Sequence, residues 1–459
     1  MRLRDAARAA CVSRAFLDSW RHHPNLNLTT LTLGCSNFTR KVDRILKRHS
    51  GVGVRTLDLE FIESNASNCL DSWLQVAVTP QIKELTLKLP SYRFSDNEFS
   101  DDEFSDNELD NRFSHEQYKF PCSLLYDGNR SSIQYLALIS CSFQPAVQLG
   151  CLRSLTRLHL CKVSTTGDEL GCLLSNSLVL ERLELRYCHI ISLKIPCLLR
   201  CLSYLYVYGC SKLQEIDNQA QNISSICLRE FPALDSPRES LQFGELLHLK
   251  NIQMSCFNAA YYARAELPSI APNVETLAAF SCCEMVNTPM APSKFIHLKH
   301  LTVQLVRVNL SPAYDYFCLV SFIDASPSLE TFNLIVSRFM KHDSIFEGSA
   351  DLRKMPLCRH HNLRNFKITS FCSAKGLVEL TCHVLENTTS LECVTLDTTA
   401  NSLRCPKGQF RRCLTLQEDH IREAQRALLA IETYIRMKVP ATVKLDVLEP
   451  CKRCHAVVL

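Results

Sequence analysis

Cysteine and histidine are the residues of this sequence whose types and spacing could support metal or haem chemistry. The 459-residue chain contains 25 cysteines, and Cys451-Lys-Arg-Cys454-His455 near its C-terminus matches the attachment motif of a c-type haem. Haem attachment requires export to a haem-loading compartment and a second iron ligand, and the sequence indicates neither. Zinc bound by the same two thiols with Cys405 and Cys413 is the alternative, although the spacing of Cys405 and Cys413 is looser than that of a zinc knuckle. We therefore predict no metal site and no cofactor.

The remaining cysteine and histidine residues that could act as ligands or bases stand alone in the sequence. Cys358-Arg-His360-His361 and His22-His23 lack partners at a recognisable spacing, which favours surface or packing roles for them. The sequence has no glycine-rich phosphate loop, no Gly-x-Ser-x-Gly elbow and no His-Glu-x-x-His helix, and glycine is scarce at 12 residues. The chain is therefore predicted not to be an enzyme.

An acidic insertion spans residues 92–119, where three basic side chains accompany nine acidic ones. Three near-identical five-residue units, which begin at Phe94, Phe99 and Phe104, fit neither a helical nor a strand period, so a solvated loop is expected. Their Ser-Asp-x-Glu pattern is favoured by acidophilic kinases, and the predicted phosphorylation sites are Ser95, Ser100 and Ser105. A neutral expansion of the loop is the alternative. Removing the −6 of this segment from the overall +4 leaves +10, too small and scattered an excess to indicate nucleic acid as a partner.

The elements that must position any site come from a repeat of the form apolar, two variable, apolar, one variable, apolar. Copies begin at Ile82, Ile133, Leu155, Leu180, Leu202, Ile223, Leu249, Val274, Leu298, Leu329, Leu363 and Leu391. From Ile133 onward the starts lie 21 to 34 residues apart, close to the period of leucine-rich repeats. The predicted fold class is therefore α/β, a leucine-rich-repeat solenoid with a curved parallel sheet on its concave side and helices and irregular coils on its convex side.

A small or aromatic side chain recurs three residues after the last apolar position of many repeats. The set comprises Cys141, Cys188, Cys210 and Cys282, with Phe231, Phe257 and Phe371 in other copies. A buried thiol behaves as a small hydrophobe, so these cysteines are predicted to pack inside the turn that follows each strand. The repeat thus explains several cysteines without disulfides or metals.

Between and after the repeats, the apolar pattern changes to the period of a helix. Residues 312–325 and 377–386 are predicted helices of the convex side. Apolar residues at intervals of three and four over 421–435 predict an amphipathic helix, and the alternation over 443–447 predicts a strand. This C-terminal segment, 401–459, is expected to close the end of the repeat array.

The N-terminus lacks the apolar run of a signal peptide, and no apolar stretch approaches 18 residues. We therefore expect no membrane partner and a reducing compartment, the cytoplasm or the nucleus.

Residues 1–25 read as helical, unlike the repeats that follow them. The segment from Arg4-Asp-Ala-Ala to Phe16-Leu-Asp-Ser-Trp20 resembles the second half of an F-box, as found in plant F-box proteins with leucine-rich repeats. In that family the F-box docks on a Skp-type subunit of a cullin-based ubiquitin ligase, and the resemblance implies docking through Val12, Ser13, Phe16 and Trp20. The alternative is that these residues only cap the first coil. The expected domains are a partial F-box at 1–25, repeats at 26–400 and the closing segment.

The predicted function is substrate recognition for a ubiquitin ligase, through a protein substrate bound on the open face of the sheet. The variable positions between the leucines point away from the core, and the residues predicted to contact a substrate are His159, Arg186, Tyr206, Tyr208 and Gln304. The alternative is a repeat scaffold or competitor that binds a protein partner without docking to the ligase.

Overall fold

The structure is a computed structural model of the whole chain. It describes residues 3–50, 52–61, 67–90, 117–125, 132–145, 152–229, 242–243, 246–284, 287–305, 314–336, 342–347, 351–353, 358–399 and 418–451. The chain divides into two compact units. The first consists of Met1–Ser225 and Ala233–Glu245, and the second consists of Ile226–Pro232 and Leu246–Leu459.

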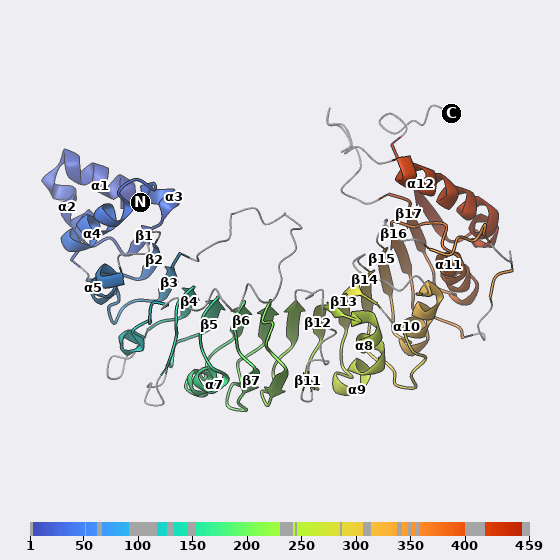
Figure 1. The fold of residues 1–459 in the computed structure, drawn as a ribbon, viewed down its shortest axis with the longest axis horizontal. Helices are drawn as coiled ribbons and strands as arrows, with labels where there is room; N and C mark the ends of the chain where they lie inside the picture. The colour runs from blue at the N-terminus through green and yellow to red at the C-terminus, as the bar shows by residue number, and fades with distance from the viewer. Residues whose placement is uncertain are drawn as a thin grey trace. The chain divides into compact units, whose positions relative to one another are not determined.

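In the described part of the first unit, seven strands of one parallel sheet follow one another in chain order (Figure 1). They are β1 (Asn25–Leu28), β2 (Thr56–Glu60), β3 (Glu84–Lys88), β4 (Tyr135–Ile139), β5 (Arg157–Cys161), β6 (Arg182–Arg186) and β8 (Tyr204–Tyr208). The described part of the second unit contains eight parallel strands. These are β10 (Ser225–Arg229), β12 (Asn251–Phe257), β13 (Thr276–Cys283), β14 (His300–Leu305), β15 (Thr331–Val336), β16 (Asn365–Thr369), β17 (Cys393–Asp397) and β18 (Lys444–Leu448).

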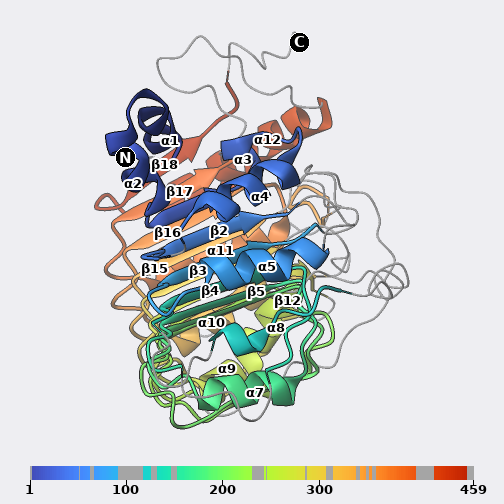
Figure 2. The same ribbon diagram turned by 90° about the vertical axis from the view of Figure 1, so that its left-hand side faces the viewer.

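Every one of the twelve predicted repeat copies forms a strand, which begins two residues after the first apolar position of the copy. The all-parallel order confirms the leucine-rich-repeat fold class. The in-register stacking places like residues on like: Leu136 pairs with Leu158, and Leu158 with Leu183. Figure 2 shows β2, β3 and β4 lying side by side in this way. Because alternate side chains point to the same face, one face of each strand is a continuous buried ladder of leucine and related residues.

A left-handed residue follows several strands and turns the chain away from the sheet. Ser140, Lys162, Tyr187 and Gly209 have φ values of 59°, 53°, 53° and 62°, each at the position directly after its strand. The next position after three of them holds one of the predicted cysteines, and all three of these thiols are buried: Cys141, Cys188 and Cys210. The Cys188 thiol donates to the carbonyl oxygens of Leu160 and Arg186, at 3.6 and 3.5 Å. The predicted packing role of these cysteines is confirmed.

The phenylalanines at the same repeat position differ in burial. Phe371 is buried and Phe257 is half-buried. Phe231 and the side chain of Cys282 lie outside the described residues.

The first unit also contains a small parallel sheet that the sequence did not predict. Its strand order is β11 (Gln242–Phe243), β9 (Glu215–Asn218) and β7 (Ser192–Ile195). Leu193, Ile195 and Ile216 are buried, so this second sheet contributes to the core of the unit. Nearby, α7 (Gly167–Ser175) begins at a capping box in which Thr166 and Glu169 satisfy each other's backbone N–H groups.

Short helices surround the first strands. They are α1 (Leu3–Val12), η1 (Arg14–Phe16), α2 (Leu17–Arg21), α3 (Thr30–Leu33), α4 (Phe38–Arg48), α5 (Ser67–Ala77) and η3 (Cys122–Leu125). For His22-His23 the sequence predicted surface or packing roles; His23 is buried, and its Nδ1 lies 2.9 Å from the carbonyl oxygen of Asn25. His49 Nε2 in turn lies 3.0 Å from the carbonyl oxygen of His23. These contacts join α4 to the turn that leads into β1.

In the second unit, α8 (Ala259–Ala265), α10 (Val320–Ala325) and α11 (Lys375–Asn387) lie along the same side of the strands (Figure 1). The other helical segments are α9 (Leu267–Ile270), η4 (Tyr316–Leu319), α12 (Glu418–Ala430), the π-helical turn η6 (Ile431–Ile435) and η7 (Arg436–Lys438). The helices predicted at 312–325, 377–386 and 421–435 are therefore present in the parts of those ranges that the structure describes. The predicted C-terminal strand is β18, which pairs with β17.

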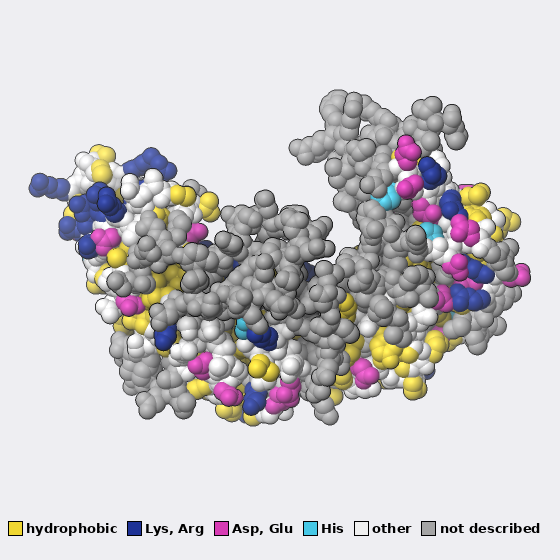
Figure 3. Space-filling view, viewed as in Figure 1, with side chains coloured by type: hydrophobic (Ala, Val, Ile, Leu, Met, Phe, Trp, Pro, Cys, Tyr) yellow, Lys and Arg dark blue, Asp and Glu magenta, His cyan; other side chains and the backbone are white. Residues whose placement is uncertain are grey.

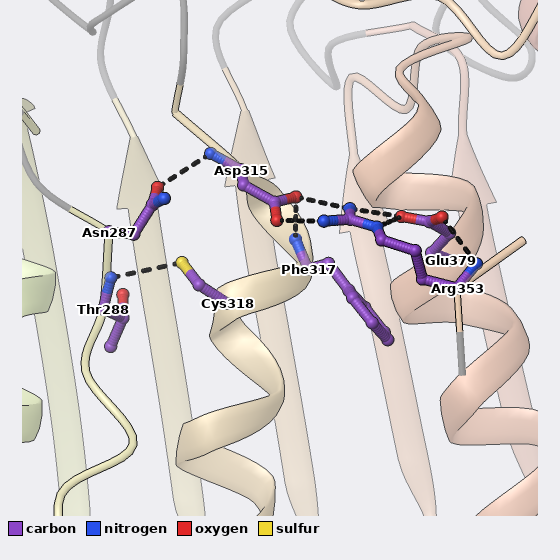
Figure 4. Close-up of polar contacts among 7 residues, drawn as sticks. All are labelled: Asn287, Thr288, Asp315, Phe317, Cys318, Arg353 and Glu379. Carbon is purple, nitrogen blue, oxygen red and sulfur yellow. Dashed lines mark hydrogen bonds and ion pairs between the residues drawn. The ribbon is translucent and has the colours of Figure 1, made fainter. Parts of the chain in front are cut away.

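An arginine joins two of these helical segments at their starts (Figure 4). Arg353 donates to both carboxylate oxygens of Asp315, at 2.7 and 2.9 Å, and Asp315 caps η4 by accepting from the Phe317 backbone N–H. The same guanidinium donates to Glu379 of α11, from Nε at 2.8 Å and from Nη2. The hydrogen bonds that Arg353 donates to these two carboxylates raise its pKa above the usual value. The arginine thus holds η4 and α11 together.

Several predicted features lie outside the described residues. They are the kinase sites Ser95, Ser100 and Ser105, and the C-terminal ligand candidates Cys405, Cys413, Cys454 and His455. The domain boundaries expected at residues 25 and 400 stay predictions. Among the helices that the structure describes, none has the length and apolar character needed to cross a membrane.

Candidate protein-binding surface

The face of the first unit that lies opposite the leucine ladder is lined by arginine and tyrosine. Its members come from the variable positions of four neighbouring strands, β4, β5, β6 and β8, and we call this surface the Arg/Tyr face. It comprises Tyr135, Arg157, His159, Arg182, Glu184, Arg186, Tyr204, Tyr206 and Tyr208, all of which are half-buried or exposed. The strand register sets the arrangement, because His159, Glu184 and Tyr206 occupy one row across adjacent strands.

Cations on the Arg/Tyr face stack on aromatic rings. Three guanidinium groups lie over tyrosine rings, Arg157 over Tyr135 at 4.7 Å, Arg182 over Tyr204 at 3.9 Å and Arg186 over Tyr206 at 4.9 Å from the ring centre. Each such contact contributes about 0.5–1 kcal/mol at an exposed site. The stacking restricts the rotamers of long side chains before any partner arrives.

Glu184 lies at the centre of the face between two arginines. Its carboxylate accepts from Arg182 Nε at 2.6 Å and from Arg186 Nη2 at 3.3 Å, and its side chain is only 15% exposed. Burial on its own raises the pKa of Glu184, but the hydrogen bond and positive charge of Arg182, with the charge of Arg186, lower it overall. The carboxylate therefore stays ionised and fixes both guanidinium groups.

His159 supplies an uncharged polar group in the same row. Burial lowers its pKa, against an opposing effect of the Glu184 charge, so the imidazole is neutral at physiological pH. Its Nε2 is buried and lacks a hydrogen-bond partner among the described residues, as does Nε of Arg186. Unsatisfied donors and acceptors on an otherwise ordered surface can be paired by the polar groups of a bound protein.

Tyrosines continue the surface at the edge of the face. The rings of Tyr187 and Tyr208 pack edge to face with centres 5.1 Å apart, and those of Tyr206 and Tyr208 lie 6.3 Å apart. Lys162 Nζ lies 5.8 Å from the centre of the Tyr187 ring. Tyr187 and Lys162 are two of the left-handed residues that follow the strands, so the turn chemistry of the repeat also shapes this surface.

The structure brings together four of the five residues predicted to bind a substrate. His159, Arg186, Tyr206 and Tyr208 share the Arg/Tyr face, whereas Gln304 belongs to β14 of the second unit. On the adjacent strands Gln304 is paired with Phe280 and Ile335, so its surroundings are apolar.

Other members of the face were not predicted. Tyr135, Arg157, Arg182 and Tyr204 all occupy the position directly before the first leucine of their strands. An aromatic or basic residue recurring at that repeat position is the sequence signal that would have identified them. Position-by-position comparison of the repeats, and not only of their leucines, would therefore have defined the face more fully.

The residues of the predicted ligase-docking segment differ in exposure. Val12 is 86% exposed and Phe16 is 47% exposed, while Ser13 and Trp20 are half-buried. Ser13 caps η1 by accepting from the backbone N–H of Ala15. Lys and Arg side chains gather over the N-terminal helices (Figure 3).

Two groups of metal-ligating side chains occur in the described part of the second unit. One consists of Asp324, Cys358 and His360, and the other of His342, Cys372 and Glu423. Sequence reasoning assigned packing or surface roles to the Cys358-Arg-His360-His361 segment. His360 is buried and Cys358 exposed, while the exposed His361 lies 3.0 Å through Nδ1 from the hydroxyl oxygen of Thr389.

Comparison with known families identifies a leucine-rich-repeat domain family. The family model described as the At1g61320/AtMIF1 leucine-rich-repeat domain matches residues 45–452. No curated protein matches the chain.

Proposed function

The chain belongs to the family of the At1g61320/AtMIF1 leucine-rich-repeat domain, whose repeats imply protein binding. From this premise we propose that the protein recognises a substrate protein for a cullin-based ubiquitin ligase. The substrate binds on the Arg/Tyr face. The N-terminal helices, with the exposed Val12 and Phe16, dock on a Skp-type subunit of the ligase.

The observation that carries substrate binding is the pre-ordered Arg/Tyr face. Tyrosine and arginine dominate the binding energy of protein interfaces, and here residues of both types lie together on four adjacent strands. Stacking and the Glu184 ion pairs already hold the arginines, which lowers the ordering cost that association imposes on long side chains. The three arginines of the Arg/Tyr face outnumber its one carboxylate, Glu184, so the face carries a net positive charge. This charge favours a substrate segment with acidic and apolar side chains.

Support for ligase docking comes from the N-terminal helices. Val12 at the end of α1 and Phe16 at the end of η1 are exposed apolar side chains of the kind that helical docking modules bury against a partner. The same segment carries the resemblance to the second half of an F-box.

The docking half of the proposal is tested by isothermal titration of the full chain with a purified Skp-type subunit. We expect binding by the natural chain and at least tenfold weaker binding by the Val12→Ser/Phe16→Ser variant. Leu31→Ser is the matched control, because Leu31 is 97% exposed in the same unit and lies outside the docking segment. Equal affinity of the docking variant and the control would exclude docking through these residues.

The substrate half is tested by proximity labelling in the native tissue, with quantitative comparison of labelled proteins between variants. Arg186→Ala and Tyr206→Ala should remove the same subset of labelled proteins. Arg200→Ala, an exposed arginine of the first unit outside the face, should retain that subset. Identical labelling by the face variants and by the control would show that substrates do not bind there.

A repeat protein that binds its partner without the ligase is the second candidate, and one observation favours it. Ala6 of α1 is buried, and the backbone N–H of Ser50 donates to the carbonyl of Arg21, so the N-terminal helices also cover the start of the sheet. Repeat arrays need capped ends, which gives these helices a role independent of docking. This second function would be identified if the chain does not bind a Skp-type subunit while Arg186→Ala and Tyr206→Ala still remove the same subset of labelled proteins.

A further inference from the structure

Three metal-ligating side chains meet in the second unit where α10 ends. Asp324 is on the last turn of α10, and Cys358 and His360 precede β16. One potential ligand atom from each of the three lies within 4.8 Å of the other two. The His360 backbone is anchored at this place, because its N–H donates to the carbonyl of Asn387 and its carbonyl accepts from the N–H of Thr389.

The polar atoms that face one another in this cluster are buried and unsatisfied. His360 is 8% exposed, and its Nε2 lies 3.2 Å from Asp324 Oδ1. This approach lacks hydrogen-bond geometry, and neither atom has another hydrogen-bond partner in the described part of the chain. Buried side-chain polar atoms are nearly always hydrogen-bonded or bound to an ion, so this pair requires an explanation.

The unsatisfied groups extend into α11, which packs beside the cluster. Nε2 of His383, Oδ1 of Asn387 and Oγ1 of Thr388 are also buried and without a hydrogen-bond partner among the described residues. The rings of His360 and His383 are 6.3 Å apart. A cation at the cluster would bind the lone pairs of His360 and Asp324 and would orient the remaining dipoles around one charge.

The distances fit a tetrahedral transition-metal site. Zinc binds histidine nitrogen at about 2.0–2.1 Å and carboxylate oxygen at about 2.0–2.2 Å, which places two such ligands about 3.3–3.5 Å apart in a tetrahedron. The observed 3.2 Å between His360 Nε2 and Asp324 Oδ1 is close to that edge. Imidazole, thiolate and carboxylate together are a donor set that suits zinc and does not suit magnesium or calcium, which prefer oxygen alone.

The second group, His342, Cys372 and Glu423, serves as an internal comparison. His342 Nε2 lies 3.2 Å from Glu423, and that carboxylate also accepts from the backbone N–H of Ser373 at 2.6 Å. The ion pair joins α12 to the segment that contains His342, and the Ser373 hydrogen bond joins α12 to the turn after β16, so these groups satisfy one another. They therefore need no metal.

We propose that Asp324, Cys358 and His360 form a zinc-binding site. The metal joins the end of α10 to the segment before β16, and through the His360 backbone to the end of α11. The exposure of Cys358 leaves the fourth position to water. Binding requires the Cys358 thiolate and a neutral imidazole, so protons are released and affinity rises with pH.

The test is a titration of the metal-free full chain with Co²⁺, which reports a bound thiolate by its charge-transfer absorption. We expect Cys358→Ser to lose one equivalent of thiolate-bound Co²⁺, and zinc to displace the Co²⁺ from the natural chain. Cys197→Ser is the matched control, because Cys197 is also exposed and belongs to the first unit. Equal thiolate-bound Co²⁺ in the two variants, or no Co²⁺ binding by the natural chain, would overturn the proposal.

A second pair of variants separates ligands from neighbours. His360→Asn should weaken binding by on the order of a hundredfold or more, beyond the roughly 10- to 100-fold that loss of an outer-shell group causes. His361→Asn changes the adjacent exposed histidine and should leave affinity unchanged. Since Cys358 is exposed, the Cys358→Ser result stands even if the buried His360→Asn change disturbs folding. Equal affinity of the two histidine variants would exclude His360 as a ligand.

Discussion

The Arg353 contacts predict a coupling between two residues of the second unit. Glu379 is 1% exposed, and Arg353 supplies the hydrogen bonds to its carboxylate from the backbone N–H, at 2.9 Å, and from the guanidinium. Replacing Arg353 with alanine removes the guanidinium and leaves a buried carboxylate without its counter-charge. Breaking a buried ion pair costs about 3–5 kcal/mol.

Solvent exposure reduces that figure. The Arg353 side chain is 50% exposed, so water can approach the position that it leaves, and we expect Arg353→Ala to destabilise α11 by about 2–3 kcal/mol. In an Arg353→Ala/Glu379→Gln double variant the uncompensated charge is absent. The double variant should therefore be more stable than the sum of the two single changes predicts, by at least about 1 kcal/mol.

Hydrogen exchange measured by mass spectrometry on peptides from α11 gives the local free energy of opening. This local measurement suits a chain of two compact units, for which a single global unfolding transition is not assured. The two single variants and the double variant are compared with the natural chain under one condition. Strict additivity of the three free-energy changes would refute the inference that the two side chains stabilise each other.

Three further substitutions test local features of the fold. Gly171→Ala should raise the free energy of local opening of α7, measured by hydrogen exchange, by about 0.5–1 kcal/mol, because this helical glycine has open space where a Cβ would lie. Gly376→Ala should lower the corresponding free energy of α11 by about 1–3 kcal/mol, because the new Cβ would lie 2.8 Å from Asp315 Oδ1; a change of the same sign in both helices would contradict these packing arguments. Burial opposes the charged form of His342, but its contacts with Cys372 and Glu423 prevail and raise its pKa from 6.5 to about 11. The stabilisation of the folded state by protonated His342 is complete below pH 6.5 and is lost as pH rises towards 11. His342→Gln should therefore cost more stability at about pH 6 than at about pH 9, and a cost that does not change with pH would contradict this assignment.

The sequence alone determined most strands of the main sheet. Leucines at a fixed spacing produce the period-two alternation of a half-buried strand, and this local pattern predicted β3 to β6, β8, β10 and β12 to β17 with their order along the chain. It also predicted burial of Cys141 and its counterparts, because the residue directly after each strand turns the chain and places the next side chain in the core. The amphipathic period predicted α11 and α12 for the same local reason.

Only the tertiary structure decided which side chains meet. Residues of the Arg/Tyr face are neighbours because the coils stack in register. A shift of β6 or β8 by one residue would move Glu184 or Tyr206 to the opposite face of the sheet. The sheet of β7, β9 and β11 has short strands without the repeat pattern, so the sequence did not reveal it. Asp324 and His360 are 36 residues apart, and neither has a local signature of a ligand. Their approach depends on how α10 packs beside the next coil, which is a property of the folded array and not of any single segment.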